Sequence, residues 1–211
     1  QMAATQILLA IYEVNFLPCS YGYRPGISAH AAIKALTDEL QFGGHNFVVE
    51  ADIKGFFDNL RWEWLERMLE QRIDDGAFLN LIRKWLRAGI LEEDGKVIHP
   101  QTGTPQGGVI SPVLANIYLH YVLDLWFSRR VSRQSRGEAY YFRFADDFVA
   151  CFQYKEDAEG YRERLKDRLE GFGLELAEDK TRCIEFGRFA RESAYKRGEK
   201  PKEFTFLGFT H

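Results

Sequence analysis

The stretch Tyr140-Tyr141-Phe142-Arg143-Phe144-Ala145-Asp146-Asp147-Phe148-Val149-Ala150-Cys151-Phe152 places an acidic pair between two strand-like runs. Aromatic and β-branched residues favour strands, and the short polar pair between them permits the chain to reverse. The stretch therefore predicts a β-hairpin whose tip carries two carboxylates. Such a pair repels itself unless a cation lies beside it. Asp-Asp is also common in purely structural turns, because Asp accepts hydrogen bonds from its own backbone, so the interpretation depends on the rest of the chain.

A third carboxylate, Asp52, ends another strand-like run from Asn46 to Ile53. Side chains alternate along a strand, which places Asp52 on the face opposite to the apolar one. The sequence Lys54-Gly55-Phe56-Phe57 follows directly, and a turn there would offer successive N–H groups to the oxygens of a triphosphate. Carboxylates on strand ends are suitable ligands for magnesium, and a magnesium pair indicates phosphoryl transfer. The structural alternative for Asp52 is a solvated carboxylate at a strand end.

The segment Thr104-Pro105-Gln106-Gly107-Gly108 precedes a long apolar run that begins at Ser111-Pro112. Two glycines permit a ligand to approach the backbone closely, and the Gln106 amide is both donor and acceptor. The structural alternative is a turn that leads into a helix. Ser111 as a cap followed by proline predicts a helix start, and the continuous apolar run to Trp126 predicts that this helix is central.

Composition and charge restrict the class of protein. The 211 residues carry a net charge of −3, which is unusual for an enzyme that binds nucleic acid. Basic residues do cluster locally, although each cluster has a solvated surface as its alternative; the clusters are Arg129, Arg130, Arg133 and Arg136, and Arg188, Arg191, Lys196, Arg197, Lys200 and Lys202. Three cysteines without metal-ligand spacing indicate a reducing compartment. No apolar run reaches the length of a membrane span, and no signal peptide is visible.

Apolar periodicity predicts an α+β fold, with a sheet that helices cover on one face. Helices are expected at 2–16, from a Ser28 cap to Gly43, at 62–73, 78–86, 111–126 and 155–172. Asp94-Gly95 predicts a hairpin turn, and Leu174–Leu176, Thr181–Phe186 and Phe204–Phe209 are short strand candidates.

Six segments occur in the order and spacing of the reverse-transcriptase sequence blocks. They are Tyr21-Gly22-Tyr23-Arg24-Pro25, Ala51-Asp52-Ile53-Lys54-Gly55-Phe56-Phe57-Asp58, Thr104-Pro105-Gln106-Gly107-Gly108-Val109-Ile110-Ser111-Pro112, Phe144-Ala145-Asp146-Asp147, Asp179-Lys180-Thr181 and Phe206-Leu207-Gly208-Phe209. The chain resembles reverse transcriptases over nearly its whole length, and the sequences of these motifs are most similar to those of bacterial group II intron-encoded proteins (maturases). One departure is Phe144, where the family usually has tyrosine; the hydroxyl is lost but the carboxylates remain, so activity is expected to survive.

The resemblance implies a right-hand polymerase with an antiparallel palm sheet backed by helices and part of the fingers. It implies these divisions: 1–50 partial fingers, including the Arg24 block; 51–58 the palm strand with the first catalytic Asp; 59–100 a fingers or palm helical segment and hairpin; 101–211 palm. On this comparison the chain is a fragment, with a basic fingertip block expected before Gln1 and a thumb with maturase helices after His211. Poor polymerase activity is expected of the fragment alone.

The resemblance also implies site roles. Asp52 and Asp146 would hold two magnesium ions, Asp147 would assist, and the Ile53 carbonyl would complete one shell. Gln106 would contact the incoming nucleotide, and Phe57 would stack under its sugar as a steric gate, with Phe56 in reserve. The other nucleotide-binding residues would be Lys54, Gly55, Ala145 and, near the phosphates, Lys180. Leu207 and Gly208 would help to place the primer end.

The implied activity is RNA-directed DNA synthesis by two-metal nucleotidyl transfer to a primer 3′-hydroxyl, in support of intron mobility and splicing. The implied partners are an RNA template such as intron RNA, a DNA primer and deoxynucleoside triphosphates, in a bacterial cytoplasm and without a membrane. Two alternatives stay open. One is a non-catalytic RNA-binding splicing maturase, although such a protein would have no reason to keep Asp52, Asp146 and Asp147 together. The other is a reverse transcriptase of a defence-associated system.

Overall fold

A four-stranded antiparallel sheet lies at the centre of the computed structural model, which describes residues 1–88, 90–91, 97–98, 101–104, 108–187 and 190–211. The strand order is β4-β5-β1-β6, with β1 at Phe47–Ala51, β4 at Ala139–Phe144, β5 at Asp147–Phe152 and β6 at Arg182–Glu185. Ala51 at the end of β1 pairs with Phe148 near the start of β5. The register therefore brings the residues that follow β1 and those that precede β5 to the same end of the sheet.

The predicted hairpin is confirmed. Phe144 pairs with Asp147, so Ala145 and Asp146 form the turn between β4 and β5. The backbone of Ala145 has a φ of 56°, the left-handed region that residues with a side chain seldom adopt. A tight two-residue connection between twisted strands demands such a conformation. The turn is consequently strained, and its neighbours must hold it.

Helices surround the sheet. They are α1 (Met2–Tyr12), α2 (Ala29–Phe42), α3 (Phe56–Asn59), α4 (Trp62–Leu69), α5 (Gly76–Arg87), α6 (Ser111–Leu119), α7 (Ser132–Gln134), α8 (Lys155–Glu170) and α9 (Ala190–Arg197). Two π-helical segments, η1 (His120–Asp124) and η2 (Phe127–Val131), continue α6, and a 3-10 turn, η3 (Glu178–Lys180), precedes β6. Among the described residues, no helix is both long enough and apolar enough to cross a membrane.

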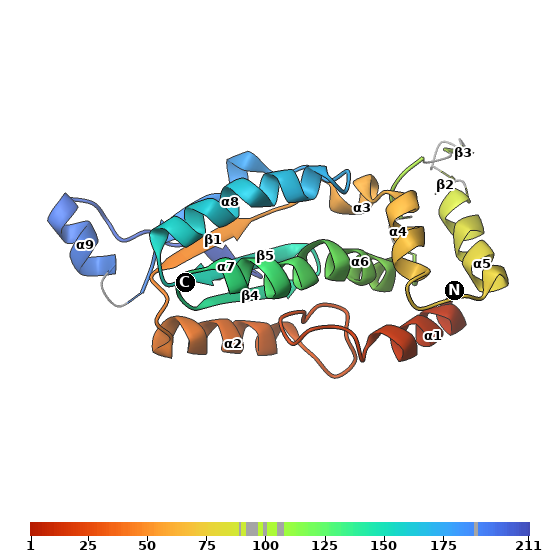
Figure 1. The fold of residues 1–211 in the computed structure, drawn as a ribbon, viewed down its shortest axis with the longest axis horizontal. Helices are drawn as coiled ribbons and strands as arrows, with labels where there is room; N and C mark the ends of the chain where they lie inside the picture. The colour runs from red at the N-terminus through yellow and green to blue at the C-terminus, as the bar shows by residue number, and fades with distance from the viewer. Residues whose placement is uncertain (89, 92–96, 99–100, 105–107, 188–189) are drawn as a thin grey trace.

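The sheet separates two apolar clusters, because successive side chains of a strand point to opposite faces. Val49 and Phe148 belong to the larger cluster, beneath α6 and α8. Val48 and Val149 belong to the smaller one, with residues of α2. Figure 1 shows α8 along one side of the sheet and α2 along the other. Helices therefore cover both faces, not one as the sequence suggested, because Val48 and Val149 also make the second face apolar.

Most predicted helices and strands are present. Ser28 caps α2 by accepting a hydrogen bond from the N–H of Ala31 at 3.3 Å. Ser111, expected as a cap, instead lies inside the first turn of α6, and Ile110 precedes the helix without a side-chain cap. The helix expected as one continuous element to Trp126 changes to π geometry at His120.

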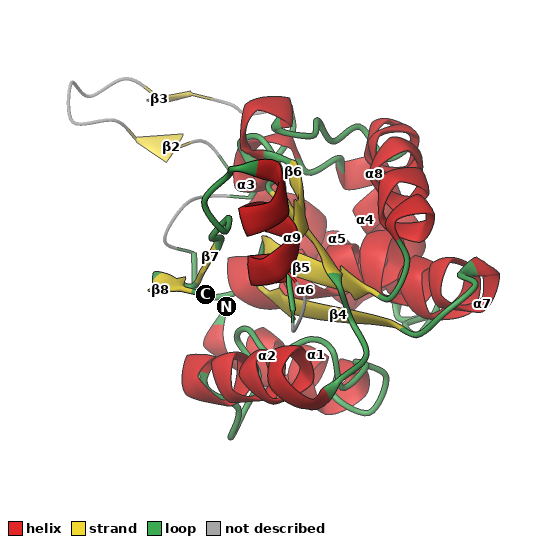
Figure 2. Cartoon of the chain, turned by 90° about the vertical axis from the view of Figure 1, so that its left-hand side faces the viewer, coloured by secondary structure: helices red, strands yellow, loops and turns green. Residues whose placement is uncertain are grey.

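Two short hairpins complete the fold. β2 (Ile90–Leu91) and β3 (Val97–Ile98) pair antiparallel, and Figure 2 shows them projecting from the body of the molecule. The predicted turn at Asp94-Gly95 lies outside the described residues. β7 (Thr205–Phe206) and β8 (Phe209–Thr210) form the second hairpin. The segment Leu174–Leu176 contributes only an isolated bridge between Leu176 and Ile53.

Candidate active site

An open cleft of about 600 Å³ lies where β1 ends and the β4–β5 hairpin turns. Asp52, Asp146, Asp147 and Lys180 all line it, although they come from segments far apart in the sequence. The antiparallel pairing of β1 with β5 brings the three aspartates together. The hydrogen bond from the N–H of Ala177 to the carbonyl of Asp52, at 2.9 Å, holds the segment before Lys180 against the end of β1.

The cleft is strongly acidic. Three further charged side chains line it among the described residues: Glu50 and Asp179 are acidic, and Arg182 is basic. Burial, followed by repulsion from Asp146, Asp52 and Glu50, raises the pKa of Asp147 to about 6, although a hydrogen bond from the N–H of Leu207 opposes the shift. Burial, followed by repulsion from Asp52, likewise raises the pKa of Asp146. Burial and mutual repulsion therefore both disfavour the charged forms of these two carboxylates.

Lys180 supplies part of that positive charge. Its Nζ lies 2.8 Å from Oδ2 of Asp52, and this hydrogen bond raises the pKa of the ammonium. The Lys180 side chain is nevertheless 65% exposed, and water screens exposed ion pairs strongly, so separation from Asp52 costs little. Lys180 is thus an exposed cation at the edge of the cleft.

The carboxylates fit a hard divalent cation in their chemistry. Oxygen ligands are those that magnesium prefers, and a bound cation would stabilise the charged forms of Asp146 and Asp147, which burial and then mutual repulsion disfavour. Over the part of the chain that the structure describes, however, no three His, Cys, Asp or Glu side chains form a group that could hold a metal ion as they stand. Side-chain rearrangement would have to accompany binding.

The β7–β8 hairpin closes one side of the cleft. The N–H of Leu207 donates to Oδ2 of Asp147 at 3.1 Å, and the N–H of Thr205 donates to Oε1 of Glu50 at 3.4 Å. Leu207 and Gly208 have φ values of 53° and 79°, and two positive φ angles are typical of the type I′ turns that join short strands. The predicted primer-placing residues therefore lie directly beside a predicted catalytic carboxylate.

The segment after Asp52 separates its two phenylalanines. Phe56 is 2% exposed and packs in the main core, whereas Phe57 is only half-buried. Lys54 is exposed and pairs with Glu175, with Nζ and Oε1 3.0 Å apart, and Gly55 precedes α3 in the left-handed conformation. Ile53 is buried, and the predicted contact of its carbonyl with a metal ion stays a prediction.

The described start of the Thr104 segment lies against Phe57. The N–H of Thr104 donates to the Phe57 carbonyl at 2.8 Å, and Nε1 of Trp62 donates to the Gly103 carbonyl at 2.6 Å. Gln106, the predicted nucleotide contact, lies outside the described residues, as do Pro105 and Gly107. The structure thus shows where the segment that leads to Gln106 lies, and the predicted role of Gln106 stays a prediction.

Sequence reasoning missed several residues that line the cleft, namely Glu50, Asp179, Arg182 and Thr205. A signal existed for Glu50, because it shares a strand face with Asp52. Arg182 lines the cleft because its guanidinium pairs with the Glu50 carboxylate at 2.5 Å, a contact that no local pattern predicts. Thr205 had no local signal, because only the folded β7–β8 hairpin brings it to the cleft.

Known proteins are similar to this chain in sequence, and solved structures are similar to it in fold. The family model described as "Reverse transcriptase (RNA-dependent DNA polymerase)" matches residues 2–211. The group II intron-encoded protein LtrA of Lactococcus lactis subsp. cremoris is 32% identical over 92% of this chain, which spans 42% of that relative's length. Among solved structures, apo telomerase from Candida tropicalis covers 99% of this chain and is covered for 38% of its own length, with a TM-score of 0.71 at 13% identity. Telomerase from Candida albicans, solved with a fragment of telomeric RNA, covers 99% of this chain and is covered for 36%, with a TM-score of 0.67 at 15% identity.

Proposed function

This chain belongs to the reverse transcriptase family, and from that premise we propose that it carries the catalytic palm of an RNA-directed DNA polymerase encoded by a group II intron. Residues 51–58 and 101–211 are assigned to the palm, residues 1–50 to part of the fingers, and residues 59–100 to a helical segment and hairpin of the fingers or palm. The observation that supports the proposal most is the meeting of Asp52, Asp146 and Asp147 in one open cleft. Carboxylates with raised pKa values in a cleft are typical of functional sites.

Two magnesium ions are the cofactors that this proposal requires, held by Asp52, Asp146 and Asp147 with help from the Ile53 carbonyl. When bound, they would polarise the primer 3′-hydroxyl and neutralise charge on the triphosphate. The residues of the chain mainly orient the reactants. The Leu207 N–H fixes one carboxylate oxygen of Asp147 and leaves the other available.

Lys180 and Phe57 have separate tasks in the proposal. An ordinary lysine has a pKa of about 10.4 and is therefore protonated at neutral pH, so the Lys180 ammonium can bind a phosphate oxygen once it leaves Asp52. Phe57, half-buried next to the Thr104 backbone, would lie under the sugar of the nucleotide. An aromatic ring there would exclude a 2′-hydroxyl.

The proposed partners are an RNA template, intron RNA among them, a DNA primer and deoxynucleoside triphosphates, and the proposed location is the bacterial cytoplasm. The group II intron-encoded relative supports the intron setting. A defence-associated setting would leave the chemistry unchanged, and the genetic neighbourhood of the coding sequence distinguishes the two.

Primer extension on an RNA template tests the activity. The natural protein that carries this chain should extend a DNA primer in magnesium and should stop in excess EDTA. Asp146→Asn should abolish extension, whereas Asp167→Asn, which makes the same charge change on the exposed face of α8, should not. Intron RNA binding without any extension by the wild-type protein would favour a non-catalytic splicing factor instead.

A further inference from the structure

Arg143 is a fully buried cation beside the catalytic hairpin. Its side chain has no exposed surface, and it lies in β4, two residues before the turn residue Ala145. Buried arginines are rare unless every donor has a partner, because an unpaired buried charge is strongly destabilising. The contacts of this guanidinium therefore indicate what the residue is for.

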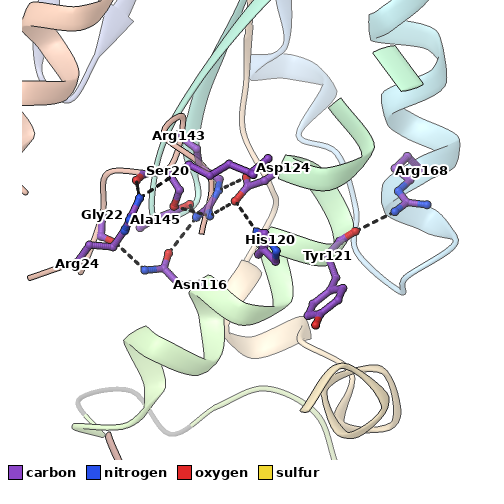
Figure 3. Close-up of polar contacts among 11 residues, drawn as sticks. Ser20, Gly22, Arg24, Asn116, His120, Tyr121, Asp124, Arg143, Ala145 and Arg168 are labelled. Carbon is purple, nitrogen blue, oxygen red and sulfur yellow. Dashed lines mark hydrogen bonds and ion pairs between the residues drawn. The ribbon is translucent and has the colours of Figure 1, made fainter. Parts of the chain in front are cut away.

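All five N–H groups of Arg143 have acceptors, as Figure 3 shows. Nε and Nη2 donate to the two carboxylate oxygens of Asp124 at 2.7 and 2.6 Å. Nη2 also donates to Oγ of Ser20 at 2.7 Å, and Nη1 donates to Oδ1 of Asn116 at 3.0 Å. The fifth bond runs from Nη1 to the Ala145 carbonyl at 2.9 Å.

The ion pair with Asp124 keeps the guanidinium in place. Burial by itself would raise the pKa of Asp124, but attraction to Arg143 and the hydrogen bonds from Arg143, with a further contribution from His120, outweigh burial and lower that pKa. Asp124 belongs to η1, the π-helical segment that continues α6. The bidentate geometry fixes the plane of the guanidinium, which in turn fixes the direction of the bond to Ala145.

A second contact holds the backbone of the same turn. A Cβ atom added at Gly22 would lie 2.3 Å from the N atom of Ala145 and 3.0 Å from the carbonyl carbon of Phe144. Only glycine permits the two backbones to approach so closely. Nδ2 of Asn116 donates to the Gly22 carbonyl at 2.6 Å, so one side chain links Gly22 to Arg143.

The segment that contains Gly22 is itself anchored. The N–H of Tyr21 donates to the Arg143 carbonyl at 2.8 Å, and the N–H of Arg143 donates to the Cys19 carbonyl at 2.8 Å. The guanidinium of Arg24 donates to the Ser20 carbonyl at 2.7 Å and pairs with Glu13 at 2.6 Å. The support of the turn is therefore a connected set of hydrogen bonds and not a single contact.

We propose that Arg143 is a positioning residue that holds the strained Ala145 turn, and thereby the carboxylate of Asp146, in the geometry required for catalysis. The Ala145 φ of 56° is costly for a residue with a side chain, and the bond to its carbonyl compensates for part of that cost. Asp146 follows directly in the chain, so a shift of the Ala145 peptide moves its carboxylate. The proposal rests on the proposed polymerase function for its kinetic readout.

Arg143→Lys in the natural protein that carries this chain tests the proposal. Lysine keeps the charge beside Asp124, but its single nitrogen cannot also serve Asn116 and the Ala145 carbonyl in the fixed planar arrangement of arginine. We expect the single-turnover extension rate per active site to fall roughly 100-fold, since small misplacements of reacting groups have effects of that size. The amplitude of the single-turnover reaction, which counts active sites, and the Kd for the nucleotide should stay within about threefold of wild type. A purely structural role predicts the opposite, a smaller single-turnover amplitude with an unchanged rate per site.

Two further variants make the test independent of folding defects. Leu165→Ala removes a fully buried side chain from α8 and serves as a destabilised control, which should lower the melting temperature without changing the rate per site. Gly22→Ala pushes on the Ala145 backbone without touching the Arg143–Asp124 pair, and should reproduce the kinetic defect of Arg143→Lys. If Arg143→Lys does not fold, Gly22→Ala still tests the step that the positioning role requires, namely that a shift of the Ala145 backbone lowers the rate per site.

Amide hydrogen exchange of a peptide that covers residues 144–148 gives a readout that does not depend on activity. Arg143→Lys should speed exchange there by roughly tenfold or more relative to Leu165→Ala. An absence of extension by the wild-type protein would overturn the proposed function, and exchange would still decide whether Arg143 holds the turn. Wild-type rate and wild-type exchange in a folded Arg143→Lys variant, or in Gly22→Ala, would overturn the positioning role.

Discussion

The three carboxylates of the cleft differ in how their charge is balanced. Asp52 has the ammonium of Lys180 at 2.8 Å, and Asp147 accepts the N–H of Leu207 at 3.1 Å. Asp146 follows the strained Ala145, and its pKa is raised by burial and by Asp52. These environments predict that the three residues are not equivalent.

Alanine substitutions should rank the carboxylates. Asp52→Ala and Asp146→Ala should each lower primer extension to about a thousandth of the wild-type rate or less, a loss of roughly 4 kcal/mol of transition-state stabilisation, because each removes oxygens that hold both proposed ions. Asp147→Ala should cost less, since one of its oxygens is already committed to the Leu207 N–H. Steady-state extension measures the ranking, and an Asp146→Ala rate within about tenfold of wild type would refute the assignment of this residue to the metal.

The adjacent phenylalanines offer a matched pair of substitutions. Phe57→Val should increase ribonucleotide incorporation relative to deoxyribonucleotide incorporation, because it opens space for a 2′-hydroxyl beside a half-buried ring. Phe56→Val should instead lower stability by about 1–3 kcal/mol, because Phe56 is buried against Tyr118 in the main core. Incorporation efficiencies and urea unfolding measure the two effects. Unchanged sugar discrimination in both variants would end the gate hypothesis.

The aspartates were open to prediction from sequence, whereas the Arg143 contacts were not. An acidic pair between two strand-like runs is a local pattern. Arg143 meets Asp124, Asn116 and Ser20 across separations of 19, 27 and 123 residues, and no short window contains such a set. One local signal was available, because an arginine between Phe142 and Phe144 in an apolar strand demands a buried partner.

At the scale of elements, the β7–β8 hairpin shows how a turn can serve chemistry. Its type I′ conformation directs the Leu207 N–H toward Asp147, although leucine is an unfavourable residue at a positive φ. Asparagine tolerates this conformation much better than leucine. The Leu207 side chain packs, partly buried, against the smaller apolar cluster, and the proposed placement of the primer end would give it a second task.

Leu207→Asn keeps the conformation of the turn but removes the leucine side chain. The variant should stay within about 1 kcal/mol of wild-type stability, because the gain from a preferred Asn-Gly type I′ pair offsets the lost contact of Leu207 with the smaller apolar cluster. Its KM for primer–template should nevertheless rise if the leucine packs against the primer. Gly208→Val serves as the contrasting variant, because the valine Cβ would meet open space and the cost would come only from the φ of 79°. Equal KM values for wild type and a folded Leu207→Asn protein would exclude the primer role.

Element prediction succeeded where periodicity was clear. The β4–β5 hairpin, α2, α5 and α8 follow from regular apolar spacing. α9 was missed because, apart from Tyr195, its apolar residues are the two alanines Ala190 and Ala194, with charged or polar residues around them. The change from α6 to π geometry was missed because a continuous apolar run has no period that would reveal an inserted residue. The coverage of the second sheet face by α2 depends on tertiary packing, which no local pattern encodes.

For the whole molecule, the Asp124–Arg143 pair joins η1, the β4–β5 hairpin and the segment around Ser20, so global stability should depend on it. Asp124→Asn should lower the free energy of unfolding by about 3–5 kcal/mol at pH 7, because it leaves a buried guanidinium without its counter-ion. The pKa of Asp124 is lowered in the folded chain from the usual 3.8, so this stabilisation is present above that pH and is lost as the pH falls toward the folded value. Urea unfolding from pH 7 to pH 3 should show that the difference in free energy of unfolding between wild type and Asp124→Asn becomes smaller below about pH 4. A difference of constant size over this pH range would contradict the assignment of a charged Asp124 to the ion pair.

The charge of the whole chain sets its interaction with nucleic acid. The net charge is −3, and the described residues that line the cleft include five acidic and two basic side chains, so phosphates should be repelled when no divalent cation is present. We predict that the 211-residue chain binds an RNA–DNA primer–template in EDTA with a Kd weaker than about 1 µM at physiological salt, given how strongly such affinity depends on cationic contacts. Magnesium should strengthen binding in the wild type but much less in Asp146→Asn, because the proposed ions neutralise the cleft through that carboxylate. Fluorescence anisotropy at constant ionic strength measures the difference, with Asp167→Asn as the charge-matched control. Nanomolar binding in EDTA, or an equal magnesium effect in Asp146→Asn, would show that the acidic cleft does not control association.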